Sequence, residues 1–246
     1  MEDKIIKIFN LEKEVVQNRK IKSIFYEHEK FNAEKKRLFD DAVENIKLVG
    51  LFNDDTINIP KYKDEEFLYE EIYLIHIELK DKKQYTRVVS VIHEFIENPV
   101  ILVLSYEKEI QLSGSITRIN KKTQEKGITE DLFQTPWISI DDESVKYLDT
   151  KKYSYESLKK FYEEYLRVML CFNLVEIIGE FKYVPKYAIL DLRVIIEKYA
   201  LLKAQIDSLK QNQKQSVGFG DKVEIQEKII KLQKELEIIK QQVKEL

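Results

Sequence analysis

The residues best suited to chemistry are Glu78 and Lys80, which are separated by one residue in EIYLIHIELK over residues 71–80. On a β-strand, side chains two positions apart point to the same face of the sheet. A Mg²⁺-dependent nuclease of the restriction-endonuclease kind needs such a pair, because the Glu and an upstream Asp hold the metal ion and the Lys orients water or stabilises the phosphorane. Asp54 or Asp55 would supply that upstream carboxylate. The alternative is a strand that simply ends in solvent, because such pairs arise by chance in a chain with 35% charged residues.

Other catalytic and metal-binding patterns are incomplete. Cys171 is the one cysteine, so neither an intramolecular disulfide nor a multi-cysteine zinc site can form. His76 shares the predicted strand face with Glu78, and His93 lies beside acidic residues on a predicted helix without an HExxH pattern. The segment 218–220 lacks the Lys-Ser/Thr of a phosphate loop. These features favour a half-buried, hydrogen-bonded His76, a His93 on a helix surface and a hairpin turn at 218–220, so we expect neither a catalytic residue nor a resident cofactor at these places.

The charge balance limits the kinds of partner. The 246 residues include 41 Lys and Arg against 44 Asp and Glu, a formal net charge of −3, which excludes a polycation that wraps nucleic acid. A local DNA-binding surface is still compatible with this charge. Basic clusters occur at 35–37, 80–83, 121–122 and 151–152, and Tyr62, Tyr85 and Tyr153 lie near some of them, so lysines could bind phosphate while tyrosines stack on bases. Neighbouring acidic residues favour solvated surfaces instead. No run approaches the roughly 18 apolar residues of a membrane helix, so we expect a cytoplasmic protein without membrane contact.

The periodicity of the first 180 residues predicts an α+β domain. Asn32 can cap a helix that runs to Glu44, and residues 84–97 and 153–178 have helical apolar spacing. Alternating or continuous apolar runs predict a mixed sheet of about five strands with covering helices. Residues 53–55 are predicted to be a turn, and residues 1–30 and 120–131 to be irregular segments and a loop. The predicted strands are 46–52, 56–59, 71–80, 100–106 and 110–119.

Residues 181–246 have a different pattern, in which apolar residues recur in alternating steps of three and four. The two series are out of phase, and Gly218 and Gly220 lie between them, so we expect an antiparallel coiled-coil hairpin rather than one long helix. The seam residues expected to mediate interaction are Ile195, Leu202, Ile206, Leu209, Ile229, Leu232, Leu236, Ile239 and Val243.

Further apolar residues flank each seam, namely Leu201, Ala204, Ile230 and Ile238. They widen the apolar stripe towards the three-in-seven face of a helical bundle. We therefore expect the hairpin to form a homodimer through a contact of four or more helices. The alternative is that the hairpin folds back and buries this second stripe on the sheet domain.

The order of segments resembles a known prokaryotic family, number 4391 in the domain-of-unknown-function series. The resemblance rests on KKRLFDDAVENIKLVGLFNDDTINIP, EEIYLIHIELKDKK, VIHEFIENPVILVLSYEKEIQLSGSITRI, TPWISI, SYESLKKFYEEYLRVML and KVEIQEKIIKLQKEL. It implies genes encoded beside restriction-modification enzymes and helicases. It also implies an accessory role in defence against foreign DNA, and no established activity. We therefore expect a non-catalytic subunit that binds a helicase, methylase or nuclease partner or DNA itself, with the nuclease or a purely structural scaffold as the alternatives.

Overall fold

The chain forms two compact units, residues Met1–Met169 and Leu170–Leu246. The computed structural model describes residues 1–119, 126–216 and 218–246, with side chains described outside residues 126–131. The first unit contains a mixed sheet with helices, and the second contains a helical hairpin, so the predicted α+β class with a C-terminal hairpin is confirmed. The sequence pattern predicts the boundary slightly later, between residues 180 and 181.

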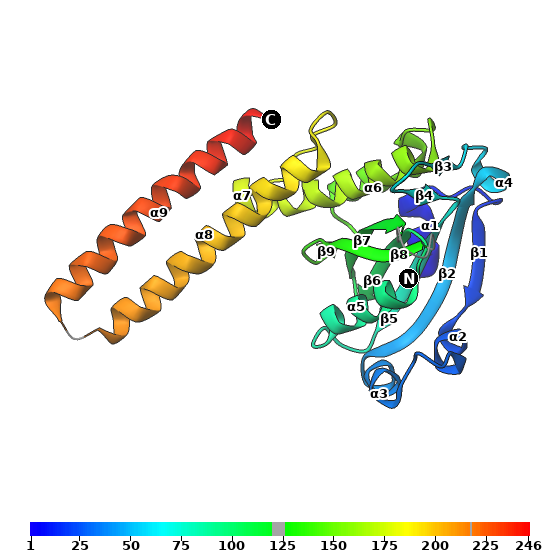
Figure 1. The fold of residues 1–246 in the computed structure, drawn as a ribbon, viewed down its shortest axis with the longest axis horizontal. Helices are drawn as coiled ribbons and strands as arrows, with labels where there is room; N and C mark the ends of the chain where they lie inside the picture. Colours follow the sequence, from blue (N-terminus) through cyan, green and yellow to red (C-terminus); the bar gives the residue numbers. More distant parts are fainter. Residues whose placement is uncertain (120–125, 217) are drawn as a thin grey trace. The chain divides into compact units, whose positions relative to one another are not determined.

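The sheet of the first unit has seven strands, two more than predicted. Six follow the order β1-β2-β5-β6-β7-β8, and β9 pairs with β7. β5 and β6 are parallel and are joined by helix α5, whereas the other neighbours are antiparallel. β2 is the long curved strand in Figure 1. The strands are β1 (Val16–Lys20), β2 (Val43–Asn53), β5 (Glu71–Leu79), β6 (Val100–Tyr106), β7 (Glu109–Ile119), β8 (Lys126–Gln134) and β9 (Ile138–Ser139), with β3 (Tyr62–Lys63) and β4 (Leu68–Tyr69) as a separate antiparallel pair.

The helices begin and end where local sequence signals favour it. The side chain of Asn32 accepts a hydrogen bond from the Lys35 backbone N–H at 2.9 Å, which caps α3 as predicted. The helices of the first unit are α1 (Glu2–Phe9), α2 (Lys22–Glu27), α3 (Ala33–Ala42), α4 (Asp54–Ile57) and α5 (Tyr85–Phe95), with 3₁₀ turns at Glu143–Leu148 and Thr150–Lys152. α6 (Leu158–Asn173) begins in the first unit, and α7 (Val175–Ile178), α8 (Ile189–Gln215) and α9 (Phe219–Glu245) belong to the second.

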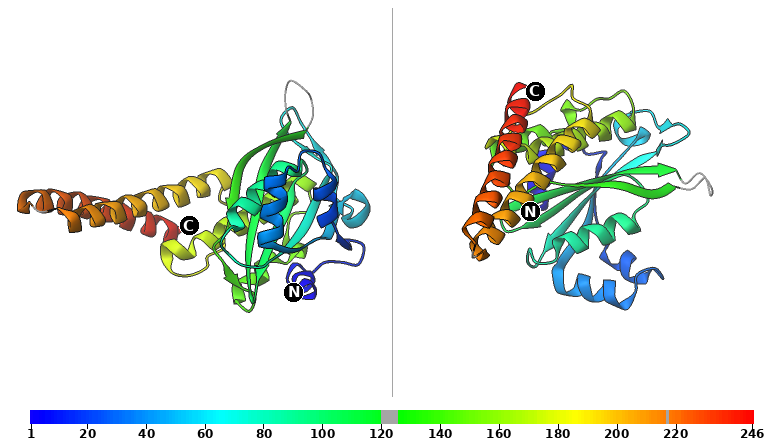
Figure 2. Two further views of the ribbon diagram at one scale, coloured as in Figure 1. Left: turned by 90° about the horizontal axis from the view of Figure 1, so that it is seen from below. Right: turned by 60° about the vertical axis from the view of Figure 1, so that its left-hand side comes forward.

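The sheet is covered on both faces, which Figure 2 shows from the side. One face, here called the α5 face, packs Ile75, Ile77 and Leu79 of β5 against α2, α3 and α5 in one apolar cluster. The other, here called the α6 face, packs against the first part of α6. A Cβ atom at Gly114 of β7 would lie 2.8 Å from Leu166 Cδ2, so the absence of a side chain there lets α6 approach the sheet. Because β6 is covered on both faces, it is apolar almost throughout, as its sequence predicts.

Three local predictions are wrong. Residues 1–30 contain α1, β1 and α2 rather than irregular segments. Residues 54–57 form α4 instead of a turn and strand, because Asn53 and Thr56 form a reciprocal capping box that outweighs the β-propensity of Thr and Ile. Lys126–Gln134 is the strand β8 rather than loop, while the remainder of that predicted loop, 120–125, lies outside the described residues.

Candidate functional site

The structure separates the residues predicted to form a nuclease site. β2 and β5 are antiparallel, and Asn53 pairs with Glu71 at the start of β5, whereas Asn45 pairs with Glu78 near its end. Asp54 and Asp55 follow Asn53, so they lie at the opposite end of β5 from Glu78 and Lys80. Seven residues of strand span about 23 Å. The predicted grouping is wrong, because a single Mg²⁺ ion bridges ligands at about 2.1 Å each.

Lys80 has a structural partner instead. Its ammonium group donates a hydrogen bond of 2.7 Å to the carbonyl oxygen of Asp40 in the last turn of α3. Lys22 donates a similar bond of 2.7 Å to the Val43 carbonyl, and burial together with the charge of Lys80 lowers the pKa of Lys22. Two ammonium groups thus satisfy carbonyls at the negative end of a helix. Glu78 is exposed, and no group of three or more His, Cys, Asp or Glu residues in the described parts of the chain is placed to hold a metal ion.

A buried histidine–serine pair lies on the α6 face of the sheet. His76 Nε2 of β5 lies 2.7 Å from Ser105 Oγ of β6. A serine next to a histidine is the arrangement of an activated nucleophile, but a nucleophile must be reached by its substrate. Both side chains are almost fully buried, and burial lowers the pKa of His76 to about 4, so the imidazole is neutral at pH 7. The pair joins two parallel strands within the core.

A second such network lies on the α5 face. His93 of α5 contacts two serines of β7, with Nε2 at 2.9 Å from Ser113 Oγ and Nδ1 at 3.1 Å from Ser115 Oγ. Burial lowers the pKa of His93 to about 4 as well. Both ring nitrogens therefore have hydrogen-bond partners, and the network anchors α5 on the sheet. The interpretation of His76 as a hydrogen-bonded histidine is confirmed, whereas the prediction of His93 as a helix-surface histidine is wrong, because α5 turns this side chain onto the sheet and buries it.

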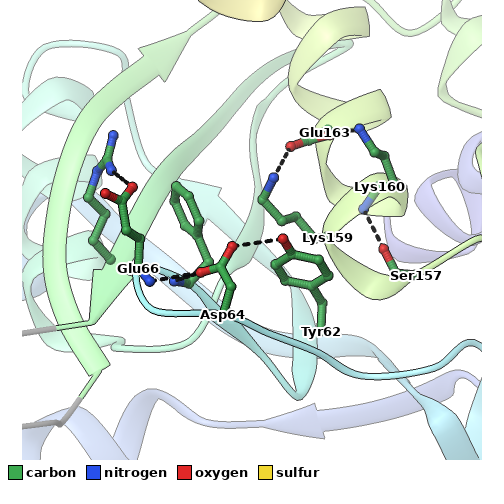
Figure 3. Close-up of polar contacts among 9 residues, drawn as sticks. Tyr62, Asp64, Glu66, Ser157, Lys159, Lys160 and Glu163 are labelled. Carbon is green, nitrogen blue, oxygen red and sulfur yellow. Dashed lines mark hydrogen bonds and ion pairs between the residues drawn. The ribbon is translucent and has the colours of Figure 1, made fainter.

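Tyr62 meets a lysine at the β3–β4 hairpin, but this lysine is Lys159 of α6, which belongs to none of the predicted basic clusters; Figure 3 shows side chains from the hairpin and from α6. Lys159 Nζ lies 5.2 Å from the centre of the Tyr62 ring and 4.9 Å from that of Phe67. Tyr62 donates a hydrogen bond of 2.7 Å to Asp64, which lowers the pKa of that carboxyl. Lys159 also pairs with Glu163 at 2.7 Å.

The other cation of this cluster is paired too. The guanidinium of Arg118 lies 5.0 Å from the centre of the Phe67 ring and forms an ion pair with Glu66. A phosphate group would have to compete with Glu66 and Glu163 for the two cations. The hairpin therefore has the aromatic and basic residues of a nucleic-acid surface, but its charge is already balanced.

Of the tyrosines predicted to lie near basic clusters, Tyr85 belongs to a lysine–aromatic cluster and Tyr153 is in the core. Lys82 Nζ lies 4.4 Å from the centre of the Trp137 ring and pairs with Glu109, and Tyr85 packs edge-to-face on Trp137. Tyr153 is buried, so it is a core residue rather than a stacking platform. The cluster at 121–122 lies outside the described residues.

The second unit is dominated by the hairpin of α8 and α9, which run side by side in opposite directions in Figures 1 and 2. α8 ends at Gln215 and α9 begins at Phe219, so the chain turns where the sequence predicts a break. The seam residues from both helices are buried or half-buried. The buried ones are Ile195, Leu202, Ile206, Ile229, Ile239 and Val243, and the half-buried ones are Leu209, Leu232 and Leu236.

A second set of apolar residues on the hairpin is exposed. Leu201 is 60% exposed and Ile238 is 67% exposed, and Ile230 is exposed as well. Leu190 and Val194 precede Leu201 by eleven and seven residues, which places all three on one face of α8. Sequence reasoning identified Leu201, Ile230 and Ile238 but missed Leu190 and Val194, whose steps of four and seven residues leading to Leu201 were the available signal.

The comparison with known families gives a match over most of the chain. Residues 12–236 match the family described as Domain of unknown function (DUF4391). The chain belongs to the DUF4391 family. The DUF4391 match includes the seven-stranded sheet and most of the hairpin, so both units are part of the family's domain. No curated protein and no solved structure shows a significant similarity to this DUF4391 chain. In the described parts of the chain, no helix has both the length and the apolar character needed to cross a membrane.

Proposed function

We propose that this DUF4391 protein is a non-catalytic assembly subunit, and that its α8–α9 hairpin associates with the hairpin of a second copy. The observation that supports this proposal is the exposed apolar set on a hairpin whose own seam is already filled. An exposed Leu or Ile leaves in water a side chain whose burial contributes about 1.5–3 kcal/mol. Several of them along two helices mark a surface for protein contact.

The dimensions of the hairpin suit self-association. Each helix has 27 residues and is about 40 Å long. Two hairpins packed along this length would bury on the order of 1,600 Å², which is the size of a stable protein interface. Basic and acidic residues occur in equal numbers on α9, so like charges do not oppose the approach of a second copy. A symmetric pair of hairpins would form a four-helix bundle.

The wider role follows from the family resemblance. Genes of the family are expected beside restriction-modification enzymes and helicases, so we propose that the dimer works in a prokaryotic DNA-defence system in the cytoplasm. Its partner would be a helicase, methylase or nuclease that performs the chemistry, since the residues predicted for catalysis in this chain lie apart. DNA would contact that partner first, because the cations beside Tyr62 and Phe67 already have carboxylate partners.

The test is the mass of the full chain in solution, measured by light scattering at micromolar concentration. We expect a dimer for the wild type and a monomer for the double variant Leu201→Glu with Ile230→Glu, because both side chains are exposed and their replacement removes nothing from the core. The control is Gln211→Glu with Gln233→Glu, which adds the same charge at exposed polar positions of the same helices and should remain dimeric. A monomeric wild type, or dissociation of the control to the same extent, would refute self-association through this surface.

A further inference from the structure

The first unit contains a cavity that none of the predicted sites uses. It has a volume of about 400 Å³, within the range of small-molecule sites. It lies on the α5 face of the sheet near the edge strand β1. Its walls are largely apolar and come from α2, from the end of α5 and from the strands beneath. Representative wall residues are Ile24, Phe25, Leu48, Ile75 and Phe95.

One end of this cavity is lined by polar side chains that hydrogen-bond to one another. Glu71 and Tyr73 of β5 both line it, and the Tyr73 hydroxyl donates a hydrogen bond to Glu71 Oε1. Asn98 Nδ2 donates to the same oxygen at 3.0 Å and lies 2.9 Å from the Tyr73 hydroxyl. Burial and the hydrogen bond to Glu71 raise the pKa of Tyr73 to about 12, so the phenol remains a donor at neutral pH. The carboxylate is therefore held in place through Oε1.

A cation lies at the same end. Arg19 of β1 lines the cavity, and its charge acts on the Tyr73 hydroxyl. Its guanidinium has no hydrogen bond or ion pair with another residue in the described parts of the chain, and Glu71 likewise has no cationic partner there within ion-pair distance. The two opposite charges thus border one cavity without forming a pair with each other.

The backbone of β1 has a bulge next to this cation. Asn18 has a φ of 45°, in the left-handed region that non-glycine residues rarely adopt, and the pairing of β1 with β2 shifts register between Val16 and Arg19. A bulge of this kind redirects the side chains that follow it. Here the residue that follows is Arg19, and it lines the cavity. The bulge therefore directs this guanidinium towards the cavity.

From these features we propose that the cavity binds a small apolar zwitterion, with the chemistry of a branched or aromatic amino acid. The carboxylate of the ligand would pair with Arg19, its ammonium group with Glu71, and its apolar body would fill the space between Ile24, Phe25 and Ile75. An anion alone would meet the uncompensated carboxylate of Glu71, and a cation alone would meet Arg19. A ligand with both charges satisfies both groups, which is why the zwitterion is favoured over either.

Isothermal titration calorimetry on the full chain tests this with probes that share one apolar body. L-phenylalanine has both charges, phenylacetate has only the carboxylate, phenethylamine has only the ammonium, and glycine lacks the apolar body. We expect the dissociation constant for L-phenylalanine to be at least tenfold lower than for each of the other three. Equal affinity for phenylacetate or phenethylamine, or no heat from L-phenylalanine up to 10 mM, would overturn the proposal.

Two variants that each remove one charge assign the roles of the two charged residues. Arg19→Gln should raise the dissociation constant for L-phenylalanine at least tenfold and leave the weak binding of phenethylamine unchanged or improved. Glu71→Gln keeps an acceptor for Tyr73. It should likewise raise the dissociation constant for L-phenylalanine at least tenfold, and it should leave the weak binding of phenylacetate unchanged or improved. Arg37→Gln, at a distant exposed arginine, should change neither value. Equal loss in the Arg37 control would mean that net charge, rather than this cavity, determines binding.

Discussion

The ammonium nitrogen of Lys80 lies 2.7 Å from the carbonyl oxygen of Asp40, and this contact joins the end of β5 to the end of α3. The same residue is half of the Glu-x-Lys pair that the sequence presents as a nuclease motif. Spacing on a strand predicts that Glu78 and Lys80 share a direction, but β5 ends at Leu79 and Lys80 lies just beyond it. The spacing does not predict which other element lies at that end of the strand, and here the element is the C-terminus of a helix rather than a cluster of carboxylates.

This contact predicts that Lys80 contributes to stability and Glu78 does not. Lys80→Ala should lower the free energy of unfolding by about 0.5–1 kcal/mol, because a helix-terminal carbonyl loses a charged donor. Glu78→Ala should change it by less than about 0.5 kcal/mol, since the side chain is exposed. Urea denaturation measures both, with Lys83→Ala at an 86% exposed side chain as the control. A Mg²⁺-dependent DNA cleavage by the wild type that both variants lose would contradict the structural role.

The two buried histidines predict how stability depends on pH. Their pKa values are about 4 in the folded chain, below the ordinary value of 6.5, because burial disfavours the charged imidazole. Between pH 6.5 and pH 4 the unfolded chain therefore binds more protons, so stability is complete above pH 6.5 and falls as the pH is lowered through this range. We expect each histidine to account for a loss on the order of 2 kcal/mol between pH 7 and pH 5.

Variants assign this loss to the two side chains. His76→Gln and His93→Gln should each flatten the dependence of the unfolding free energy on pH, whatever their stability at pH 7. His28→Gln serves as the control because His28 is exposed. Denaturation curves recorded from pH 7 to pH 5 give the slopes. An unchanged slope in both buried-site variants would show that other groups cause the acid sensitivity.

Close packing of α6 on the sheet predicts that Gly114 cannot be replaced without cost. An added methyl group would lie 2.8 Å from Leu166 Cδ2, 3.0 Å from Tyr165 Cε1 and 3.1 Å from the Tyr162 hydroxyl. That hydroxyl accepts a hydrogen bond from the Ser115 backbone N–H at 3.0 Å, so a shift of Tyr162 would disturb a buried polar contact. Gly114→Ala should therefore lower the free energy of unfolding by about 1–3 kcal/mol.

The matched control for Gly114→Ala is Gly220→Ala. Gly220 lies in the first turn of α9, and a Cβ atom there would have no neighbour within 4 Å. The control should be neutral or slightly stabilising, because alanine favours the helix by about 1 kcal/mol over glycine. Equal destabilisation by the two substitutions in urea denaturation would count against the packing argument.

Sequence periodicity predicted the central strands and most of the helices, because burial on one or both faces leaves a clear apolar pattern. Glu71–Leu79 and Val100–Tyr106 are the clearest cases. The pattern is weaker where a strand lies at an edge, and β1 and β8 were therefore missed: β1 is exposed over nearly its whole length. At Asn53–Thr56 two side-chain hydrogen bonds determine the backbone, and residue propensities do not represent them.

The candidate sites were less predictable than the fold. The cavity beside Arg19 depends on a bulge and on side chains from five separate elements, and no local spacing in the sequence marks such a convergence. The hairpin seam depends on a repeat that runs along each of the two helices, so the spacing alone located it. Whether Asp54 lies near Glu78 depends on the register of β2 with β5, which a single sequence does not contain, and this register places the two residues at opposite ends of β5.

Two adjacent isoleucines of α9 allow the seam and the outer surface to be tested separately. Ile239 is 4% exposed, whereas Ile238 is 67% exposed, although the two residues are chemically identical and share the same helix. Ile239→Ala should cost about 2–5 kcal/mol of local stability, because it leaves a cavity in the seam. Hydrogen exchange should then accelerate at amides of both α8 and α9, since each helix depends on the other. Ile238→Ala should leave exchange within the hairpin nearly unchanged in a monomeric background such as Leu201→Glu with Ile230→Glu. Acceleration of equal size in both variants would show that the seam does not hold the two helices together.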